Sequence, residues 1–163
     1  MGSRADFHTH SSYSDGVLSP SELIDLAYRR GVRIMALTDH DITDGLPEGF
    51  EAAGRYPDFT LIPGIEVSTD VPGNEVHVLG YFIDWRSRDF QTKLASLRDS
   101  RLDRGRRIVE KLEALGLPLS WRRVQEIAGV GAVGRPHIAQ ALVEAGHVST
   151  VNEAFDLYIS RNG

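Results

Sequence analysis

The hydrophobic and polar positions along the first half of the chain predict short strands separated by helices. Residues 5–10 predict a first strand. The capping-box sequence SPSE at 19–22 predicts the start of a helix that ends at Gly31, since glycine favours the position just after a helix. The compact apolar run 32–37 then has the composition of a buried parallel strand.

The same pattern continues to the middle of the chain. A second helix is predicted over 46–55, followed by a strand over 59–68 that a Pro-Gly turn interrupts. A turn at 71–74 leads into a β-rich segment at 75–83. Strands that alternate with helices are typical of βαβ units, so we expect an α/β fold with a parallel sheet.

From residue 87 onward the pattern becomes helical. One long, charge-rich helix is predicted over 87–115, and its apolar side consists of Phe90, Leu94, Leu97, Ile108, Val109, Leu112 and Leu115. Three shorter helices follow: one capped by Ser120 and running to 128, one opened by Pro136 after a glycine-rich loop, and one begun by the capping box Thr150-x-x-Glu153. We therefore expect two parts, residues 1–86 and an all-helical 87–163.

Composition narrows the chemistry that the chain can perform. The 163 residues are 41% hydrophobic, which fits a chain that buries its own core. The net charge of −5 argues against a broad duplex nucleic-acid surface, although a local anion site remains compatible with it. No cysteine is present, so a metal would have to bind His, Asp and Glu, a ligand set that suits Zn, Mn, Fe or Mg. No apolar run approaches the roughly 20 residues of a membrane span, and the cytoplasm is the expected compartment.

The first strand ends in a candidate metal-binding pair. His8 and His10 are two residues apart, so in a β-strand both imidazoles point to the same face. Asp15 follows in the next loop and could return to the same point. Two surface histidines near the chain terminus are the alternative interpretation.

Three more polar residues lie at or near later strand ends. Taken one at a time, His40 fits a helix-capping loop, Glu66 fits an exposed turn, and His77 fits a hydrogen-bonded core histidine. Taken together with the first pair, four histidines and two carboxylates at successive strand ends are difficult to explain by packing. Burial of so many ionisable groups is costly unless a cation pairs with them. The pattern therefore predicts a metal centre.

Four ordered motifs carry a resemblance to a known family. The segments DFHTH…SDG at 6–16, LTDHD at 37–41, PGIEVS at 63–68 and EVHVLGY at 75–81 resemble the PHP (polymerase and histidinol phosphatase) family of metal-dependent phosphoesterases. The helical segment GRPH at 134–137 is similar to the inserted region of the small bacterial 3',5'-nucleoside bisphosphate phosphatases.

This resemblance implies a fold and a set of site residues. The fold would be α/β, the N-terminal part of a distorted (β/α)7 TIM-like barrel with an all-helical insertion, holding two or three divalent ions (Mn, Zn, Fe or Mg). The implied metal ligands are His8, His10, Asp15, His40, Glu66 and His77. Arg135 and His137 would bind the substrate phosphate, and Asp39 and Asp41 would support the ligands or handle protons.

The resemblance also implies an activity. It is hydrolysis of phosphate monoesters of small nucleotides, either 3',5'-nucleoside bisphosphates or short oligonucleotides such as RNA, through a metal-bridged hydroxide. The alternatives are a metal-dependent amidohydrolase and a non-catalytic, metal-stabilised scaffold. The family pattern continues with His-Pro and Asp-x-His segments that this sequence lacks. We therefore expect a C-terminal barrel segment or a partner chain to supply the remaining strands.

Overall fold

The structure is a computed structural model that describes residues 4–71, 74–129 and 133–159. The chain forms two compact units, Met1–Leu97 and Arg98–Gly163. The division between them falls within the long helix α3 (Arg88–Ala114). The predicted boundary between a barrel part, 1–86, and an inserted part, 87–163, stays a prediction.

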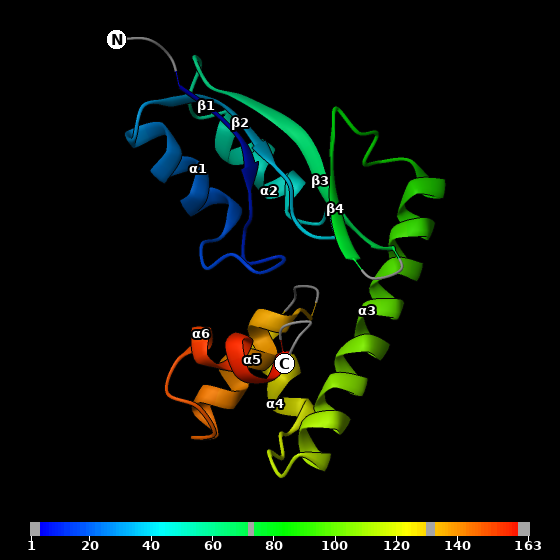
Figure 1. The fold of residues 1–163 in the computed structure, drawn as a ribbon. Coiled ribbons are helices and arrows are strands. Elements are labelled where there is room, and N and C mark those ends of the chain that lie inside the picture. Colours follow the sequence, from blue (N-terminus) through cyan, green and yellow to red (C-terminus); the bar gives the residue numbers. More distant parts are fainter. Residues whose placement is uncertain (1–3, 72–73, 130–132, 160–163) are drawn as a thin grey trace. The chain divides into compact units, whose positions relative to one another are not determined.

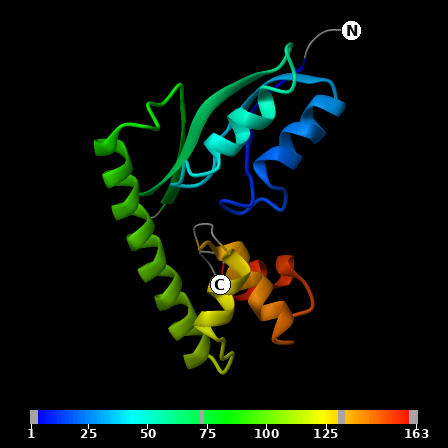
Figure 2. The ribbon, with the colours of Figure 1, turned by 180° about the vertical axis from the view of Figure 1, so that it is seen from behind.

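The first unit is a curled four-stranded sheet with helices on one face (Figures 1 and 2). Its strands lie in the order β1 (Arg4–Thr9), β2 (Val32–Leu37), β3 (Thr60–Val71) and β4 (Asn74–Tyr81). The first three strands are parallel, as the βαβ pattern predicts, and β4 is antiparallel to β3. Helices α1 (Pro20–Arg29) and α2 (Leu46–Ala53) connect the parallel strands.

The two faces of this sheet differ because side chains alternate along each strand. Met35 and Leu37 of β2 and Leu61 of β3 point to the helices and pack with Ile24 and Leu46 into a buried cluster. Gly49 of α2 lets that helix approach the sheet, since a Cβ there would lie 3.1 Å from a Leu61 methyl. The opposite face carries the other half of each strand, including the polar residues of the predicted site.

The start of the first predicted helix is confirmed in detail. Ser19 accepts a hydrogen bond from the Glu22 backbone, and the Glu22 carboxylate accepts one from the Ser19 backbone. Gly31 has φ +85°, the left-handed conformation expected just after a helix. The second helix ends at Ala53 rather than at residue 55. Part of the predicted turn at 71–74 lies outside the described residues.

The prediction of a Pro-Gly turn inside the third strand is wrong. β3 runs without interruption from Thr60 to Val71, and Pro63 pairs with Leu37 while its carbonyl accepts from the Ile83 backbone. Gly64 is required by close packing, because a Cβ there would lie 2.7 Å from the Thr38 methyl. The glycine thus marks the contact of two strands at their ends.

The second unit is helical among its described residues. It contains the later turns of α3, then α4 (Trp121–Ala128), α5 (Arg135–Glu144), α6 (Val151–Ala154) and a π-helical turn, η1 (Phe155–Ile159). Its buried core includes Val109, Leu112, Val124, Ile138 and Leu142. Gly105 of α3 lies against the Trp121 ring, where a Cβ would lie 3.1 Å from the nearest ring carbon.

Three details of these helices differ from the sequence prediction. Leu115 is 66% exposed, because it follows the last turn of α3 instead of extending its apolar side. α5 begins at Arg135, so Pro136 occupies its second position. Thr150 caps α6 as predicted, but the Glu153 carboxylate accepts from the Ser149 backbone rather than closing the box on Thr150.

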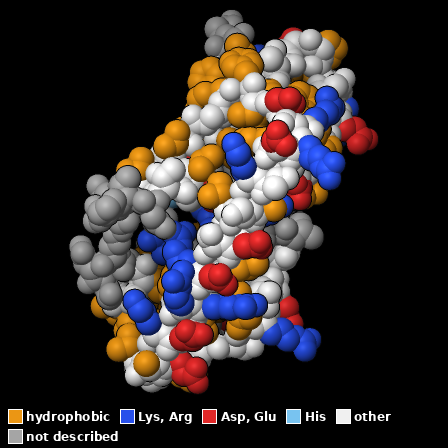
Figure 3. Space-filling model, turned by 90° about the vertical axis from the view of Figure 1, so that its right-hand side faces the viewer, with side chains coloured by type: hydrophobic (Ala, Val, Ile, Leu, Met, Phe, Trp, Pro, Cys, Tyr) orange, Lys and Arg blue, Asp and Glu red, His pale blue; other side chains and the backbone are white. Residues whose placement is uncertain are grey.

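Two further observations concern the charges on the surface and the apolar character of the helices. Lys and Arg side chains are interspersed with Asp and Glu over the face that Figure 3 presents. Across the part of the chain that the structure describes, no helix has the length and apolar character needed to cross a membrane. The cytoplasmic location expected from the sequence stays a prediction.

Candidate metal centre

An irregularity near the end of β1 aims His8, which lies in the strand, and His10, which follows it. Between Asp6 and Thr9, β1 uses three residue steps where β2 uses two, from Met35 to Leu37. Such a bulge re-aims side chains next to a site. His8 Nε2 lies 2.8 Å from a Glu66 carboxylate oxygen, and His10 Nε2 lies 3.0 Å from the same oxygen. Both imidazoles therefore reach one point, as the H-x-H spacing predicts.

The next histidine is placed by an extension of the β2–β3 pairing. His40 and Glu66 form an isolated parallel bridge just beyond the end of β2. The Glu66 backbone N–H donates to the Asp39 carbonyl, and the Asp41 N–H donates to the Glu66 carbonyl. These two bonds fix His40 beside Glu66, with the His40 Nε2 atom 3.6 Å from the carboxylate.

Glu66 is the centre of the cluster. Its side chain is 4% exposed, and His77 Nδ1 from β4 lies 2.6 Å from its second oxygen. One carboxylate thus faces four imidazoles. Burial by itself raises the pKa of Glu66, but the hydrogen bonds from His8 and His77 and the charges of His40 and His10 outweigh it. The pKa of Glu66 therefore lies below its ordinary value, and the carboxylate is ionised near neutral pH.

Asp15 completes the set on the side of the β1–α1 loop. Its carboxylate lies 3.5 Å from His10 Nδ1 and 3.6 Å from His40 Nε2. The six residues form three overlapping groups, each with ligand atoms within 4.8 Å of one another: His8, His10 and Glu66; His10, Asp15 and His40; His40, Glu66 and His77. The structure thus brings together all six residues that the sequence singled out.

Asp39 ties the Asp15 loop to the end of β2. Its buried carboxylate accepts from the Ser11 backbone at 2.7 Å, from the Ser11 hydroxyl at 2.7 Å and from the Ser14 hydroxyl at 2.6 Å. Burial raises the pKa of Asp39 above its ordinary value, against these hydrogen bonds and the charge of His10. Sequence reasoning missed both serines, although their position between His10 and Asp15 was an available signal.

Asp41 holds the other side of the cluster. Its carboxylate accepts from the Ser68 backbone at 3.0 Å, which joins the chain after β2 to β3. Asp41 has φ +54°, a left-handed conformation that aspartate adopts more readily than most residues. Both aspartates therefore fix backbone segments that carry the clustered histidines.

The two predicted phosphate-binding residues lie in the second unit, in the first turn of α5. The Gly134 N–H donates to His137 Nδ1 at 3.0 Å, so this neutral imidazole carries its proton on Nε2. Arg135 is the first residue of the helix. Their predicted contact with a substrate phosphate stays a prediction.

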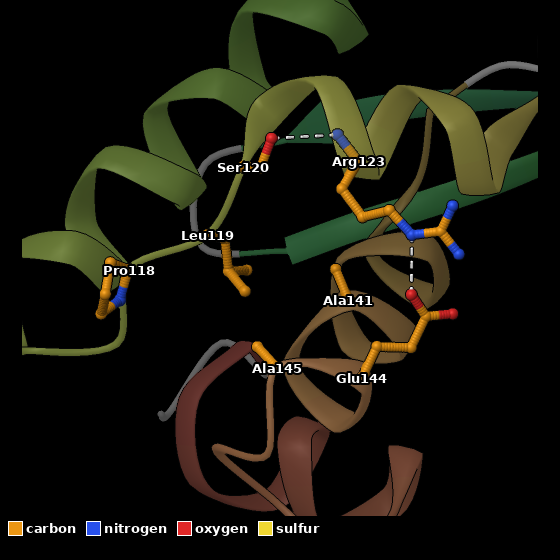
Figure 4. A pocket seen from close by; sticks show the side chains of 7 residues that line it. All are labelled: Pro118, Leu119, Ser120, Arg123, Ala141, Glu144 and Ala145. Atoms are coloured by element: carbon orange, nitrogen blue, oxygen red, sulfur yellow. Dashed lines mark hydrogen bonds and ion pairs between the residues drawn. The ribbon is translucent and has the colours of Figure 1, made fainter.

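The second unit also contains a cavity of about 300 Å³. Figure 4 shows its lining by Pro118, Leu119, Ser120, Arg123, Ala141, Glu144 and Ala145. Arg123 and Glu144 are paired across it at 2.8 Å. The lining is largely small or apolar, and its charged groups neutralise each other, so the cavity has none of the clustered ligands found around Glu66.

The donor set around Glu66 fits divalent metal ions. Four imidazoles and two carboxylates offer nitrogen and oxygen ligands of the kind that Zn, Mn and Fe prefer. The two oxygens of Glu66 face different histidines, which is the arrangement a bridging carboxylate needs. A cation would also offset the cost of burying these groups together.

Comparisons with known proteins agree with this geometry. A sequence model of the PHP domain matches residues 6–158. The chain is 38% identical over 157 residues to the 5'-3' exoribonuclease Rnm of Salmonella typhimurium, covering 96% of this chain and 54% of that protein. It is 36% identical over 161 residues to the 3',5'-nucleoside bisphosphate phosphatase of Chromobacterium violaceum, covering 95% of this chain and 54% of the phosphatase.

A solved structure matches the fold. It comes from a Bifidobacterium adolescentis protein assigned as a metal-dependent phosphoesterase, with a TM-score of 0.87 and 33% identity, covering 98% of this chain and 56% of that chain. The chain thus spans about half the length of the relatives it matches, 54% of each of the two enzymes above.

Proposed function

Because the chain belongs to the PHP domain family, we propose that it forms part of a metal-dependent phosphoesterase that releases phosphate from small nucleotides. The proposed substrates are 3',5'-nucleoside bisphosphates or short RNA. Two relatives carry names for cleavage of phosphate esters, one a bisphosphate phosphatase and one an exoribonuclease. Those names favour phosphate over amide hydrolysis, the alternative that the sequence left open.

The observation that supports this proposal most directly is the cluster of four histidines around the buried Glu66. The proposed metal ligands are His8, His10, Asp15, His40, Glu66 and His77, which would hold two or three ions. When bound, such ions supply hydroxide at neutral pH and neutralise charge on the phosphoryl oxygens.

The chain's own residues would hold the ligands and the substrate in place. Asp39 and Asp41 fix the segments on either side of His40 through bonds to Ser11, Ser14 and Ser68. Arg135 would bind a phosphate with two parallel N–H groups, and the Nε2 proton of His137 would donate to a phosphate oxygen. The N-terminus of α5 adds partial positive charge at the same place.

We further propose that residues 1–86 are the N-terminal part of a (β/α)7 TIM-like barrel and that 87–163 are a helical insertion. The curled sheet with helices on one face supports this arrangement. A C-terminal barrel segment or a partner chain would then contribute the remaining strands.

The test combines metal content with phosphate release. The purified chain, free of a polyhistidine tag, is analysed for bound metal. It is then assayed for release of phosphate from a 3',5'-bisphosphate and for release of phosphate or nucleoside 5'-monophosphates from 5'-phosphorylated short RNA. We expect Arg135→Ala to raise KM at least tenfold without loss of metal, because phosphate binding and metal binding use different residues. Arg122→Ala is the matched control, since that side chain is 89% exposed and paired within its own helix.

The outcomes separate the candidate functions. Bound metal with phosphate release that Arg135→Ala impairs supports the proposal. Release of ammonia or a carboxylate from amides, with none from phosphate esters, would favour the amidohydrolase. Bound metal with no turnover, even when the rest of a related enzyme is added, would favour the third candidate, a non-catalytic, metal-stabilised scaffold.

A further inference from the structure

We infer that Tyr81 is a positioning residue of the metal centre. Its hydroxyl holds the peptide unit between Phe7 and His8, and this bond keeps the His8 imidazole beside His10 and Glu66. The inference rests on the metal binding in the proposed function and does not depend on the reaction proposed there.

The contact between Tyr81 and Phe7 joins the first and last strands of the sheet. β2 and β3 lie between β1 and β4, so the backbones of these two strands would be roughly 14 Å apart in a flat sheet. The Tyr81 hydroxyl nevertheless donates to the Phe7 carbonyl at 2.9 Å, and the two rings meet edge to face with centroids 6.2 Å apart. Because Tyr81 and Glu66 lie on the same side of the β3–β4 pair, the sheet curls toward the face that carries the metal ligands.

Two side chains hold the peptide unit that joins Phe7 to His8. This unit lies inside the bulge between Asp6 and Thr9, where the register with β2 shifts. Its carbonyl oxygen accepts from Tyr81, and its N–H, which belongs to His8, donates to the Asp6 carboxylate at 3.3 Å. Side chains thus set the direction of the backbone at the point from which the His8 ring extends.

His8 depends on such support more than the other clustered histidines do. Its side chain is 50% exposed, whereas those of His10, His40 and His77 are 21%, 10% and 31% exposed. Surrounding atoms therefore restrain its ring least, and the direction of the ring follows from the backbone that carries it.

Tyr81 also couples the two sides of Glu66. His77 lies on the same strand and the same face as Tyr81 and contacts one oxygen of the carboxylate, while His8 contacts the other oxygen. The hydroxyl bond from β4 to the peptide unit of His8 therefore fixes the separation of two ligands that flank Glu66. Loss of the bond should displace His8 rather than His77, since the β3–β4 pairing still holds β4.

Removal of one hydroxyl group tests the inference. Tyr81→Phe keeps the ring and its contact with Phe7 and removes only the donor. Tyr28→Phe is the matched control, because the Tyr28 hydroxyl donates to Asp58 at the same distance of 2.9 Å. We expect Tyr81→Phe to weaken the binding of one cobalt ion to the metal-free chain by about 10- to 100-fold. Tyr28→Phe should bind cobalt as the unaltered chain does.

A double-mutant cycle with His8→Ala separates positioning from a general loss of structure. In the His8→Ala background, Tyr81→Phe should change the cobalt affinity by less than about twofold, because the ligand that the hydroxyl positions is already absent. The visible absorption spectrum of the cobalt-loaded Tyr81→Phe chain should shift toward that of His8→Ala, since the spectrum reports the ligands and geometry around the ion.

A second measurement needs no metal. The His8 and His10 rings have centroids 5.0 Å apart, so their protons should show a nuclear Overhauser effect in the metal-free chain. We expect this effect to disappear in Tyr81→Phe and to persist in Tyr28→Phe. Asp6→Ala frees the N–H of the same peptide unit and should weaken the effect as well. Circular dichroism and the melting temperature establish that the variants fold.

The outcomes distinguish this inference from the proposed function. Weaker cobalt binding in Tyr81→Phe that vanishes in the His8→Ala background supports the inference. Unchanged cobalt affinity overturns it and leaves the proposed function standing. Equal losses in Tyr28→Phe, or in the His8→Ala background, also overturn it, because they indicate a general loosening of the chain. Loss of the contact between the His8 and His10 rings in a chain that binds no metal would sustain the positioning role and count against the proposed function.

Discussion

Glu66 shows how one buried side chain can organise four histidines from three separate segments. It accepts contacts from His8 and His10 of the first strand region, from His40 after β2 and from His77 of β4. These residues are up to 69 positions apart, from 8 to 77. The carboxylate supplies the negative charge that lets four imidazoles crowd together in a partly buried space.

Glu66→Gln should therefore weaken metal binding by at least about 100-fold while the chain stays folded. The amide keeps the size of the side chain but loses its charge and one acceptor oxygen. Metal titration followed by calorimetry measures the affinity. Glu51→Gln, at an exposed position of α2, is the control and should bind as the unaltered chain does. Equal affinity in both variants would remove Glu66 from the metal ligands.

Gly16 should not tolerate substitution, because a larger side chain has no room there. A Cβ at this position would overlap the His10 carbonyl oxygen and carbon, which are backbone atoms and cannot turn away. Gly16→Ala should lower the free energy of unfolding by about 1–3 kcal/mol and displace Asp15 from the cluster. Urea unfolding measures the change. Gly54→Ala, at the residue that follows α2, where the backbone is still in a helical conformation and a methyl group has room, should change stability by less than about 1 kcal/mol.

At the scale of elements, Asp39 ties the β1–α1 loop to the end of β2. Three donors, from Ser11 and Ser14, converge on the two oxygens of this carboxylate. Asp39→Asn replaces one acceptor oxygen with a donor group, which leaves a buried hydroxyl or N–H without an acceptor. We expect a loss of about 1–3 kcal/mol in the free energy of unfolding.

The comparison for that variant is Asp58→Asn. Asp58 accepts hydrogen bonds too, one from Tyr28 and one from Arg33, but these bonds are exposed to solvent. Solvent replaces such contacts, so its loss should stay below about 1 kcal/mol. Equal losses for the two variants would mean that Asp39 does not hold the loop.

The sequence predicted the elements whose signals are local. The capping box at Ser19, the glycine at 31 and the apolar run of β2 each depend on neighbouring residues, and each is confirmed. The meeting of His8, His10 and His40 was predicted, because the parallel strands β1 and β2 end at one edge of the sheet. Glu66 and His77 were also singled out, but they reach the cluster from within β3 and the antiparallel β4 rather than from strand ends.

The features that the sequence could not predict depend on distant contacts. Pro63 and Gly64 resemble a turn locally, but pairing with β2 and β4 keeps the backbone extended there. The serines that hold Asp39 are recognised only when β2 is placed beside β1. Contacts between residues far apart in the sequence determine these features.

At the scale of the molecule, the two units should respond differently to metal. All six proposed ligands lie in Met1–Leu97, so chelation with EDTA should destabilise that unit and leave Arg98–Gly163 unchanged. The loss should be about 2.7 kcal/mol when the free metal had been 100 times its dissociation constant.

The two tryptophans provide separate reporters. Trp85 lies in the first unit and Trp121 in the second. Fluorescence melting of Trp121→Phe then follows the first unit, and that of Trp85→Phe follows the second. EDTA should lower the midpoint in the first experiment alone, and a shift of equal size in both would contradict a metal site confined to Met1–Leu97.

Because of the bulge in β1, the metal centre depends on the number of residues between Asp6 and Thr9 as well as on the identity of the ligand residues. Deletion of one residue between Asp6 and Thr9 would leave two residue steps there, equal to the two from Met35 to Leu37, and would make the pairing of that stretch regular. The same deletion would turn the flanking side chains to the opposite faces, since their period is two. A better-paired strand would then be a poorer metal binder, so single-residue deletions in this segment should be tolerated by the fold and rejected by selection for function.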